Sequence, residues 1–186
     1  VIYHMATRAD WNTRVIPQLR EEEGFAVLPV GRVTGNLPAG VTEVDNIYLF
    51  NLMVSIDQGD PARLVHLTLA DFLSQLVSDD GATWQYDASA DAATATTGHR
   101  YILIIDQFEE IITAHPDRWP ERSEFFCQLN QALRRDPDLW ILLTLREDYV
   151  ASLDPYATLV DGKLQARFYM ERMLSLIHIS EPTRPY

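Results

Sequence analysis

The sequence predicts an α/β fold with a parallel sheet, and three observations lead to this fold class. Residues 101–105 form a short run with only apolar or aromatic side chains, and residues 139–145 form a second, almost wholly apolar run. Such runs are typical of strands buried on both faces, as in a parallel sheet. Segments with apolar residues at helical spacing lie before and between them. At 186 residues, the chain is long enough for one domain with a substantial core.

Composition excludes several classes of protein. Because 47% of the residues are hydrophobic, global disorder is not expected. The formal net charge of −12 argues against a nucleic-acid-binding surface, since contact with phosphates needs a basic patch. The single Cys127 excludes an internal disulfide and a cysteine zinc cluster, and it fits a reducing cytoplasm. No apolar run approaches about 18 residues and no segment has the pattern of a signal peptide, so we expect a cytoplasmic chain without a membrane span.

The segments before the first apolar run are expected to supply much of the core. Residues 12–19 place apolar side chains on one helical face, with Gly24 as a stop, and residues 25–30 then fit a short strand. Residues 42–56 are predicted to form a helix with a wide apolar face. We assign these helical residues to packing and not to chemistry.

A second amphipathic helix is predicted to open at Thr68, where the spacing resembles a capping box, and to keep its apolar residues through Val77 inward. Residues 78–100 are dominated by small and polar residues, which indicates a surface loop. Trp84 and Tyr86 are expected to anchor the start of that loop to the body of the domain.

A helix is predicted to start at Pro120, because proline is favoured at the first helical position, and to end at Asp136. Its apolar residues recur at helical spacing. Cys127 lies within this helix, and with no histidine or asparagine at a recognisable motif spacing we expect a buried or semi-buried thiol, not a nucleophile.

Three acids follow the first apolar run and form the main candidate site. Asp106 ends the run, and Glu109 and Glu110 follow within four positions. The carboxyl end of a strand is where open α/β sheets place their ligand sites. A carboxylate there can hold Mg²⁺ through the water shell of the ion, and a second acid can activate a water for attack on a phosphate. The alternative is a buried strand that ends in a solvated acidic turn.

The second apolar run ends in Arg146. In the same sheet as Asp106, an arginine at a strand's carboxyl end could reach a γ-phosphate and report its presence or stabilise its developing charge. The alternative is a surface arginine that pairs with Glu147 or Asp148.

The pattern of apolar residues followed by Asp106-Gln-Phe-Glu-Glu110 resembles the Walker B segment of P-loop NTPases. In this form it resembles the novel STAND NTPases, signalling ATPases of the NACHT and apoptotic-ATPase type. The segment Leu145-Arg146-Glu-Asp-Tyr149 resembles the sensor-1 position of the same family. The resemblance covers residues 12–173 and implies an incomplete P-loop NTPase three-layer sandwich with a parallel sheet.

The resemblance also implies roles for the candidate residues, with ATP and Mg²⁺ as cofactors. Asp106 would position Mg²⁺, Glu110 or Glu109 would polarise the attacking water, with a slight preference for Glu110, and Arg146 would sense the γ-phosphate. An ATP-driven conformational change would then serve signalling, through protein partners or self-oligomerisation of the parent protein.

One part of the family pattern is missing. In the family, the helix predicted over residues 12–19 follows a phosphate-binding loop that ends in Gly-Lys-Ser/Thr, but here no glycine precedes Gly24 and the only lysine is Lys163. A Walker A loop needs glycine for the close approach of its backbone to the phosphates and lysine for their charge. We therefore expect residues 12–173 to be a partial domain that is inactive alone, although its parent hydrolyses ATP. Residues 1–11 would be foreign or truncated.

The carboxyl-terminal residues divide into two stretches. Residues 162–173 resemble the family's Phe/Arg/Met-rich strand that leads toward a helical or winged-helix arm, with a solvated edge strand carrying Arg167 and Arg172 as the alternative. Residues 174–186 resemble the in-frame translation of a transposase sequencing adapter, and we exclude them from fold reasoning.

Two rival functions remain open. The first is a degenerate NTPase-like domain that only binds partners or oligomerises, as the missing Gly-rich loop would allow. The second makes Asp106 a phosphoacceptor, as in receiver domains. Those domains also need an acidic pair after their first strand and a lysine after a later one, whereas Lys163 follows no clear strand.

Overall fold

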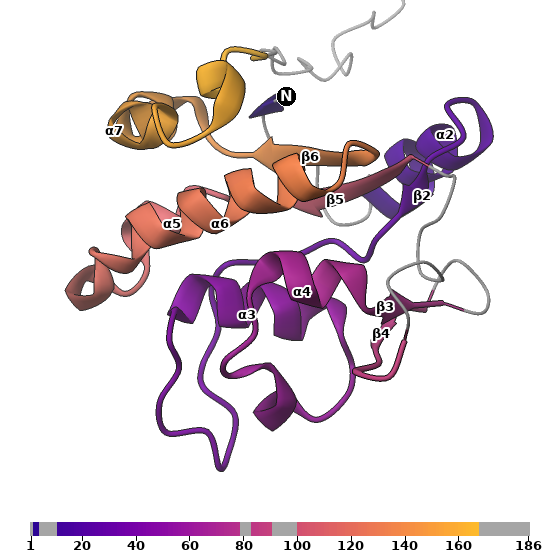
Figure 1. Cartoon of the computed structure of the whole chain (residues 1–186). Coiled ribbons are helices and arrows are strands. Elements are labelled where there is room, and N and C mark those ends of the chain that lie inside the picture. The colour runs from indigo at the N-terminus through magenta and orange to yellow at the C-terminus, as the bar shows by residue number, and fades with distance from the viewer. Residues whose placement is uncertain (1, 4–10, 79–82, 91–99, 168–186) are drawn as a thin grey trace, which may run out of the picture.

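The computed structural model describes residues 2–3, 11–78, 83–90 and 100–167 (Figure 1). The adapter-like residues 174–186 and Arg172 lie outside the described residues. At the centre is a parallel four-stranded sheet in the order β1-β6-β5-β2. Its strands are β1 (Ile2–Tyr3), β2 (Ala26–Val27), β5 (Tyr101–Ile105) and β6 (Leu139–Thr144). The predicted α/β class with a parallel sheet is confirmed.

The strand register brings three chain segments to one edge of the sheet. β5 pairs with β6 along its whole length, from Tyr101 opposite Leu139 to Ile105 opposite Leu143. On the other side of β5, Gly31 forms an isolated parallel bridge with Ile105 beyond the end of β2. The carboxyl ends of β5 and β6 and the segment that follows β2 therefore meet at the same edge.

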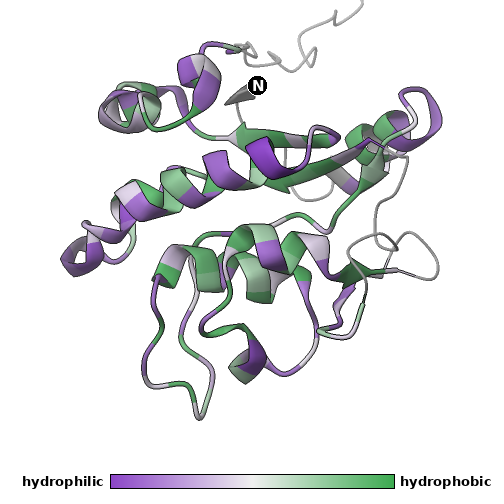
Figure 2. Ribbon diagram, in the orientation of Figure 1, coloured by the Kyte–Doolittle hydropathy of each residue, from purple (hydrophilic) through white to green (hydrophobic). Residues whose placement is uncertain are grey.

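Both faces of β5 are buried, which explains its uninterrupted apolar sequence. Tyr101, Leu103 and Ile105 join the larger hydrophobic cluster, whereas Ile102 and Ile104 join a smaller cluster on the opposite face. None of these five side chains is more than 7% exposed. Figure 2 shows the hydrophobic colour running along β5 and β6.

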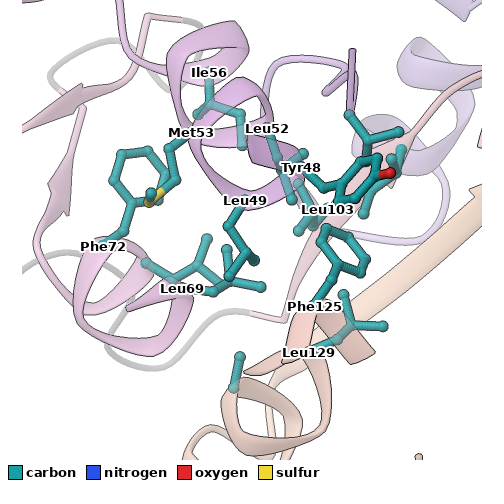
Figure 3. Close-up of a cluster of buried hydrophobic side chains, with 14 of the residues drawn as sticks. Tyr48, Leu49, Leu52, Met53, Ile56, Leu69, Phe72, Leu103, Phe125 and Leu129 are labelled. Atoms are coloured by element: carbon teal, nitrogen blue, oxygen red, sulfur yellow. The ribbon is translucent and has the colours of Figure 1, made fainter. Parts of the chain in front are cut away.

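Helices cover the two faces and complete three layers. The larger cluster is formed with α3 (Ile47–Ile56), α4 (Leu69–Ser74) and α6 (Glu121–Arg135), and Figure 3 shows side chains of all three helices gathered in one cluster with Leu103 of β5. The opposite face packs against α2 (Ile16–Glu21), which continues the π-helical turn η1 (Trp11–Val15). The shorter helical segments are η2 (Pro61–Leu64), α5 (Glu110–Thr113), η3 (Pro116–Arg118), η4 (Glu147–Leu153), α7 (Asp154–Ala157) and η5 (Asp161–Leu164).

Local capping sets where α3 begins. The prediction of a helix over residues 42–56 is wrong in its first part, because Asn46 is the N-cap. Its Oδ1 accepts hydrogen bonds from the backbone N–H groups of Tyr48 and Leu49, each at 3.1 Å. These bonds satisfy two of the amides that a helix start leaves without partners.

The helix that opens at Thr68 is shorter than predicted. Thr68 caps α4 as expected, since its Oγ1 accepts from the N–H of Asp71 at 3.1 Å. The helix ends at Ser74, however, and β3 (Leu76–Val77) pairs antiparallel with β4 (Gln85–Tyr86). Burial of the Trp84 and Tyr86 side chains favours this hairpin and confirms that they anchor the segment.

Helix α6 starts at Glu121, one residue after the predicted start at Pro120, which is the N-cap, and buries the apolar face that carries Phe125, Phe126 and Leu129. The expectation of a buried or semi-buried Cys127 is wrong, because its side chain lies on the exposed face of this helix. At the carboxyl-terminal end, the described residues up to Arg167 form the turn η5 and no strand. Among the described residues, no helix has the length and apolar character required to cross a bilayer.

Phe125 is expected to contribute strongly to stability. Its ring is fully buried, and the ring centroid lies 5.8 Å from that of Phe108 and 5.7 Å from that of Phe126. Substitution Phe125→Ala should lower the free energy of unfolding by about 3–5 kcal/mol through lost burial and a residual cavity. The matched control is Trp119→Ala, because Trp119 is 63% exposed; this change should stay within about 0.5 kcal/mol. Urea unfolding measures both, and equal losses would contradict the packing described here.

Tyr101 should make the fold sensitive to alkali. Burial raises the pKa of its hydroxyl far above the ordinary value, and the adjacent Asp136 carboxylate, which accepts its hydrogen bond at 2.8 Å, raises it further. The folded state thus retains a proton that the unfolded chain loses near pH ~10, so this stabilisation is present below that pH and lost as the pH rises above it. Unfolding curves between about pH 9 and pH 11 should fall less steeply for Tyr101→Phe than for the unaltered chain. Parallel curves would refute this assignment.

Candidate functional site

Asp106 lies directly after β5 and is fastened to both neighbouring segments of the sheet. Its backbone N–H donates to the carbonyl of Gly31 at 2.9 Å, and its Oδ1 accepts a hydrogen bond from Thr144 Oγ1 at 2.6 Å. The residue is only 7% exposed. A hydroxyl–carboxylate bond this short is charge-assisted, so it fixes the orientation of the carboxylate.

Thr144 is a site residue that sequence reasoning missed. It is the last residue of β6 and is 1% exposed. Its carbonyl also accepts from the backbone N–H of Phe108 at 2.7 Å, so the turn after Asp106 is held against the end of β6. The available signal was that Thr144 is the one polar residue within the apolar run 139–145.

An aromatic side chain anchors residues 106–110, which we call the acidic turn. Gln107 adopts a left-handed backbone with φ of 52°, which reverses the chain at the end of β5. Phe108 is then fully buried, and its ring lies 5.8 Å from the rings of both Phe125 and Phe126 of α6. This packing places the following glutamates at the start of α5.

The two adjacent glutamates have different surroundings. Both carboxylate oxygens of Glu110 accept from Arg32, with Nη2 to Oε1 at 2.7 Å and Nε to Oε2 at 3.3 Å. The Oε2 of Glu109, in contrast, is buried without a hydrogen-bond partner among the described residues. Arg32 also donates to Oε1 of Gln107. Sequence reasoning missed Arg32, whose only signal was a charged residue next to Gly31 after a predicted strand.

Arg146 lies just beyond β6, at the predicted edge of the sheet. Its Nη2 pairs with Asp148 Oδ2 at 2.5 Å, and its guanidinium carbon lies 5.6 Å from the ring centroid of Tyr149. This ion pair is the one that the alternative interpretation anticipated. The structure therefore brings Asp106, Glu109 and Glu110 together on one turn, and Arg146 follows the neighbouring strand.

The carboxylates at this edge could hold a hydrated Mg²⁺, whereas a metal held by protein ligands alone does not fit them. Within the part of the chain that the structure describes, no group of three or more His, Cys, Asp or Glu residues is placed to hold a metal ion. Mg²⁺ usually keeps several waters and takes one or two carboxylates plus substrate phosphates. Asp106 supplies such a carboxylate, already oriented by Thr144. The buried, unpartnered oxygen of Glu109 is a second acceptor on the same turn.

The Thr144–Asp106 bond can be tested by changing only the hydroxyl. Thr144→Val keeps the shape of the side chain but removes the donor to Asp106, so the free energy of unfolding should fall by about 1–3 kcal/mol. Thr144→Ser retains the hydroxyl and should lose no more than the roughly 1 kcal/mol expected for one buried methyl group. Guanidinium unfolding compares the two variants. A valine variant as stable as the serine variant would show that this bond does not fasten Asp106.

The chain is similar to a known protein family. Residues 13–176 match the model of a family described as Novel STAND NTPase 1. Searches against curated proteins and solved structures gave no match. The family match spans most of the 186 residues and includes β5, the acidic turn and β6. The chain therefore belongs to the novel STAND NTPase 1 family.

Proposed function

We propose that this chain supplies the magnesium-binding and water-activating part of a nucleotide-binding ATPase domain in a STAND-type signalling protein. The observation that carries this proposal is the buried Asp106 carboxylate, held by Thr144 Oγ1 at 2.6 Å at the carboxyl end of β5. Two further acids follow on the same anchored turn. This is the edge at which open α/β sheets bind their ligands.

The residues of the turn would divide the chemistry. Asp106 would hold Mg²⁺ through the water shell of the ion, and Thr144 would keep the carboxylate oriented. When bound with ATP, Mg²⁺ would lower the negative charge that opposes attack on the γ-phosphate. Either Glu109 or Glu110 would accept a proton from the attacking water.

Arg146 is proposed to contact the γ-phosphate. The side chains of Arg146 and Asp148 are 49% and 58% exposed, so solvent screens their ion pair. Exposed pairs of this kind contribute about 1 kcal/mol or less. Breaking the ion pair with Asp148 to bind a phosphate would therefore cost little free energy. The phosphate could accept two parallel hydrogen bonds from the Arg146 guanidinium.

Phosphate binding itself is assigned to a different segment. The sequence contains no Gly-Lys-Ser or Gly-Lys-Thr. We therefore assign Mg²⁺-dependent ATP hydrolysis to the intact parent protein, and residues 12–173 would be inactive alone. In the parent, ATP binding would drive a conformational change that reaches protein partners or further copies of the same protein. A cytoplasmic setting would keep Cys127 reduced.

The lack of Gly-Lys-Ser or Gly-Lys-Thr in the sequence also favours a second candidate, a non-catalytic interaction or oligomerisation module. Glu110 and Arg146 each already have an internal ion-pair partner, as in a domain that retains the fold without the reaction. The two candidates differ in whether a supplied phosphate loop confers ATP hydrolysis.

The test is to insert a Gly-rich loop ending in Gly-Lys-Ser directly before Asn12. The loop-bearing chain should bind ATP and hydrolyse it in the presence of Mg²⁺. Asp106→Asn in that chain should lower Mg²⁺-dependent hydrolysis by about 100-fold or more, because one preorganised charged group is lost at the reacting centre. Asp161→Asn is the control, since Asp161 lies on a remote exposed turn and pairs with Arg134.

Hydrolysis is measured as phosphate release, and ATP affinity by calorimetry. A folded, loop-bearing chain that neither binds nor hydrolyses ATP would contradict the ATPase proposal, and the interaction module would then lead. Hydrolysis that survives Asp106→Asn would remove Asp106 from the proposed metal site.

A further inference from the structure

The backbone fixes Arg32 beside the acidic turn. Gly31 is bridged to Ile105, and a Cβ built at Gly31 would clash with Cδ1 of Leu52 in α3, so a larger residue here would require the Leu52 side chain to shift. The backbone N–H of Arg32 then donates to Ser55 Oγ at 3.0 Å. Arg32 is thus tied to both the sheet and α3, and its side chain reaches the turn after β5.

The Arg32 side chain makes a forked contact with Glu110. Two guanidinium nitrogens meet the two carboxylate oxygens, and Nη2 also meets Oε1 of Gln107. The side chains of the ion pair are 36% and 23% exposed, so water is partly excluded. Forked arginine–carboxylate contacts hold direction as well as charge. A proton delivered to Glu110 would displace hydrogen bonds that Arg32 now supplies.

Glu109 has the opposite character. Its Oε2 is buried and no described residue donates to it. A buried acceptor without a donor costs stability, and proteins retain such groups where chemistry needs them. The two acids are therefore separated by environment, as in other sites where adjacent carboxylates take different roles.

We propose that Arg32 is a positioning residue that holds Glu110 in an ion pair and leaves Glu109 as the carboxylate that takes the proton of the attacking water. This inference rests on the proposed ATPase function and chooses between its two candidate acids. In the step, the water oxygen bonds to the γ-phosphorus, the bond from that phosphorus to the β–γ bridging oxygen breaks, and Glu109 receives the proton. The products are ADP and phosphate.

A first experiment needs no nucleotide. Glu110→Gln should lower the melting temperature of the chain by about 2–4 °C, the shift expected for a pair worth roughly 1 kcal/mol in a domain of this size. In an Arg32→Met background the same change should have no effect. Arg32→Lys keeps the positive charge but cannot form the two parallel hydrogen bonds, so its melting temperature should lie between those of the unaltered chain and Arg32→Met. Glu109→Gln, the matched control at the next residue, should not lower the melting temperature in either background.

Two outcomes of this cycle would overturn the proposal. One is a loss from Glu110→Gln that persists without Arg32, because the ion pair would then not be what holds Glu110. The other is a loss from Glu109→Gln as large as that from Glu110→Gln, because Glu109 would then be the structural acid.

A second experiment measures the reaction in the loop-bearing chain described above. Glu109→Gln should lower ATP hydrolysis by about 100-fold or more, as for loss of a general base, and Glu110→Gln should lower it far less. The reverse order would overturn the role given to Glu109. If the loop-bearing chain shows no hydrolysis at all, the proposed function fails and the role of Glu109 fails with it. The melting-temperature cycle still decides whether Arg32 holds Glu110.

Discussion

Burial of both faces of β5 is the constraint on which the rest of the structure depends. A strand with no exposed face needs a layer on each side, which α3, α4 and α6 provide on one face and α2 on the other. The first polar side chain after the strand, Asp106, is still inside the protein. A carboxylate in that position needs hydrogen-bond donors, and Thr144 supplies one. The burial of β5 therefore also determines where Asp106 lies and which residue it must bond.

The sequence predicted the parts of the fold that depend on local pattern. The apolar runs that became β5 and β6 were recognisable because they contain a single polar residue, Thr144; β5 is buried on both faces, whereas Trp140 of β6 is exposed. The position of Asp106 at the edge of the sheet followed from the same pattern. Two of the predictions that were wrong concern the boundaries of elements. Helix α3 starts later than predicted because Asn46 caps it, and Val77, predicted to be helical, lies in β3 and pairs with Gln85 of β4.

The contacts within the site were beyond the reach of sequence pattern, because they join distant segments. Arg32 and Glu110 are 78 positions apart, and Thr144 and Asp106 are 38 apart. Nothing in the spacing of Glu109 and Glu110 distinguishes them, since they are identical neighbours. Their difference comes from Arg32, which follows Gly31 on the segment beside the end of β5, and only the tertiary fold specifies this contact.

The exposed position of Cys127 has a practical consequence. It is the single cysteine of the sequence and it projects from α6, the helix whose Phe125 and Phe126 pack on Phe108 of the acidic turn. A maleimide fluorophore would therefore attach at one defined point without any engineering of the chain. Because α6 contacts that turn directly, the dye would sit on the element best placed to register a displacement there, and Trp119 and Trp140, both exposed, provide native energy-transfer partners.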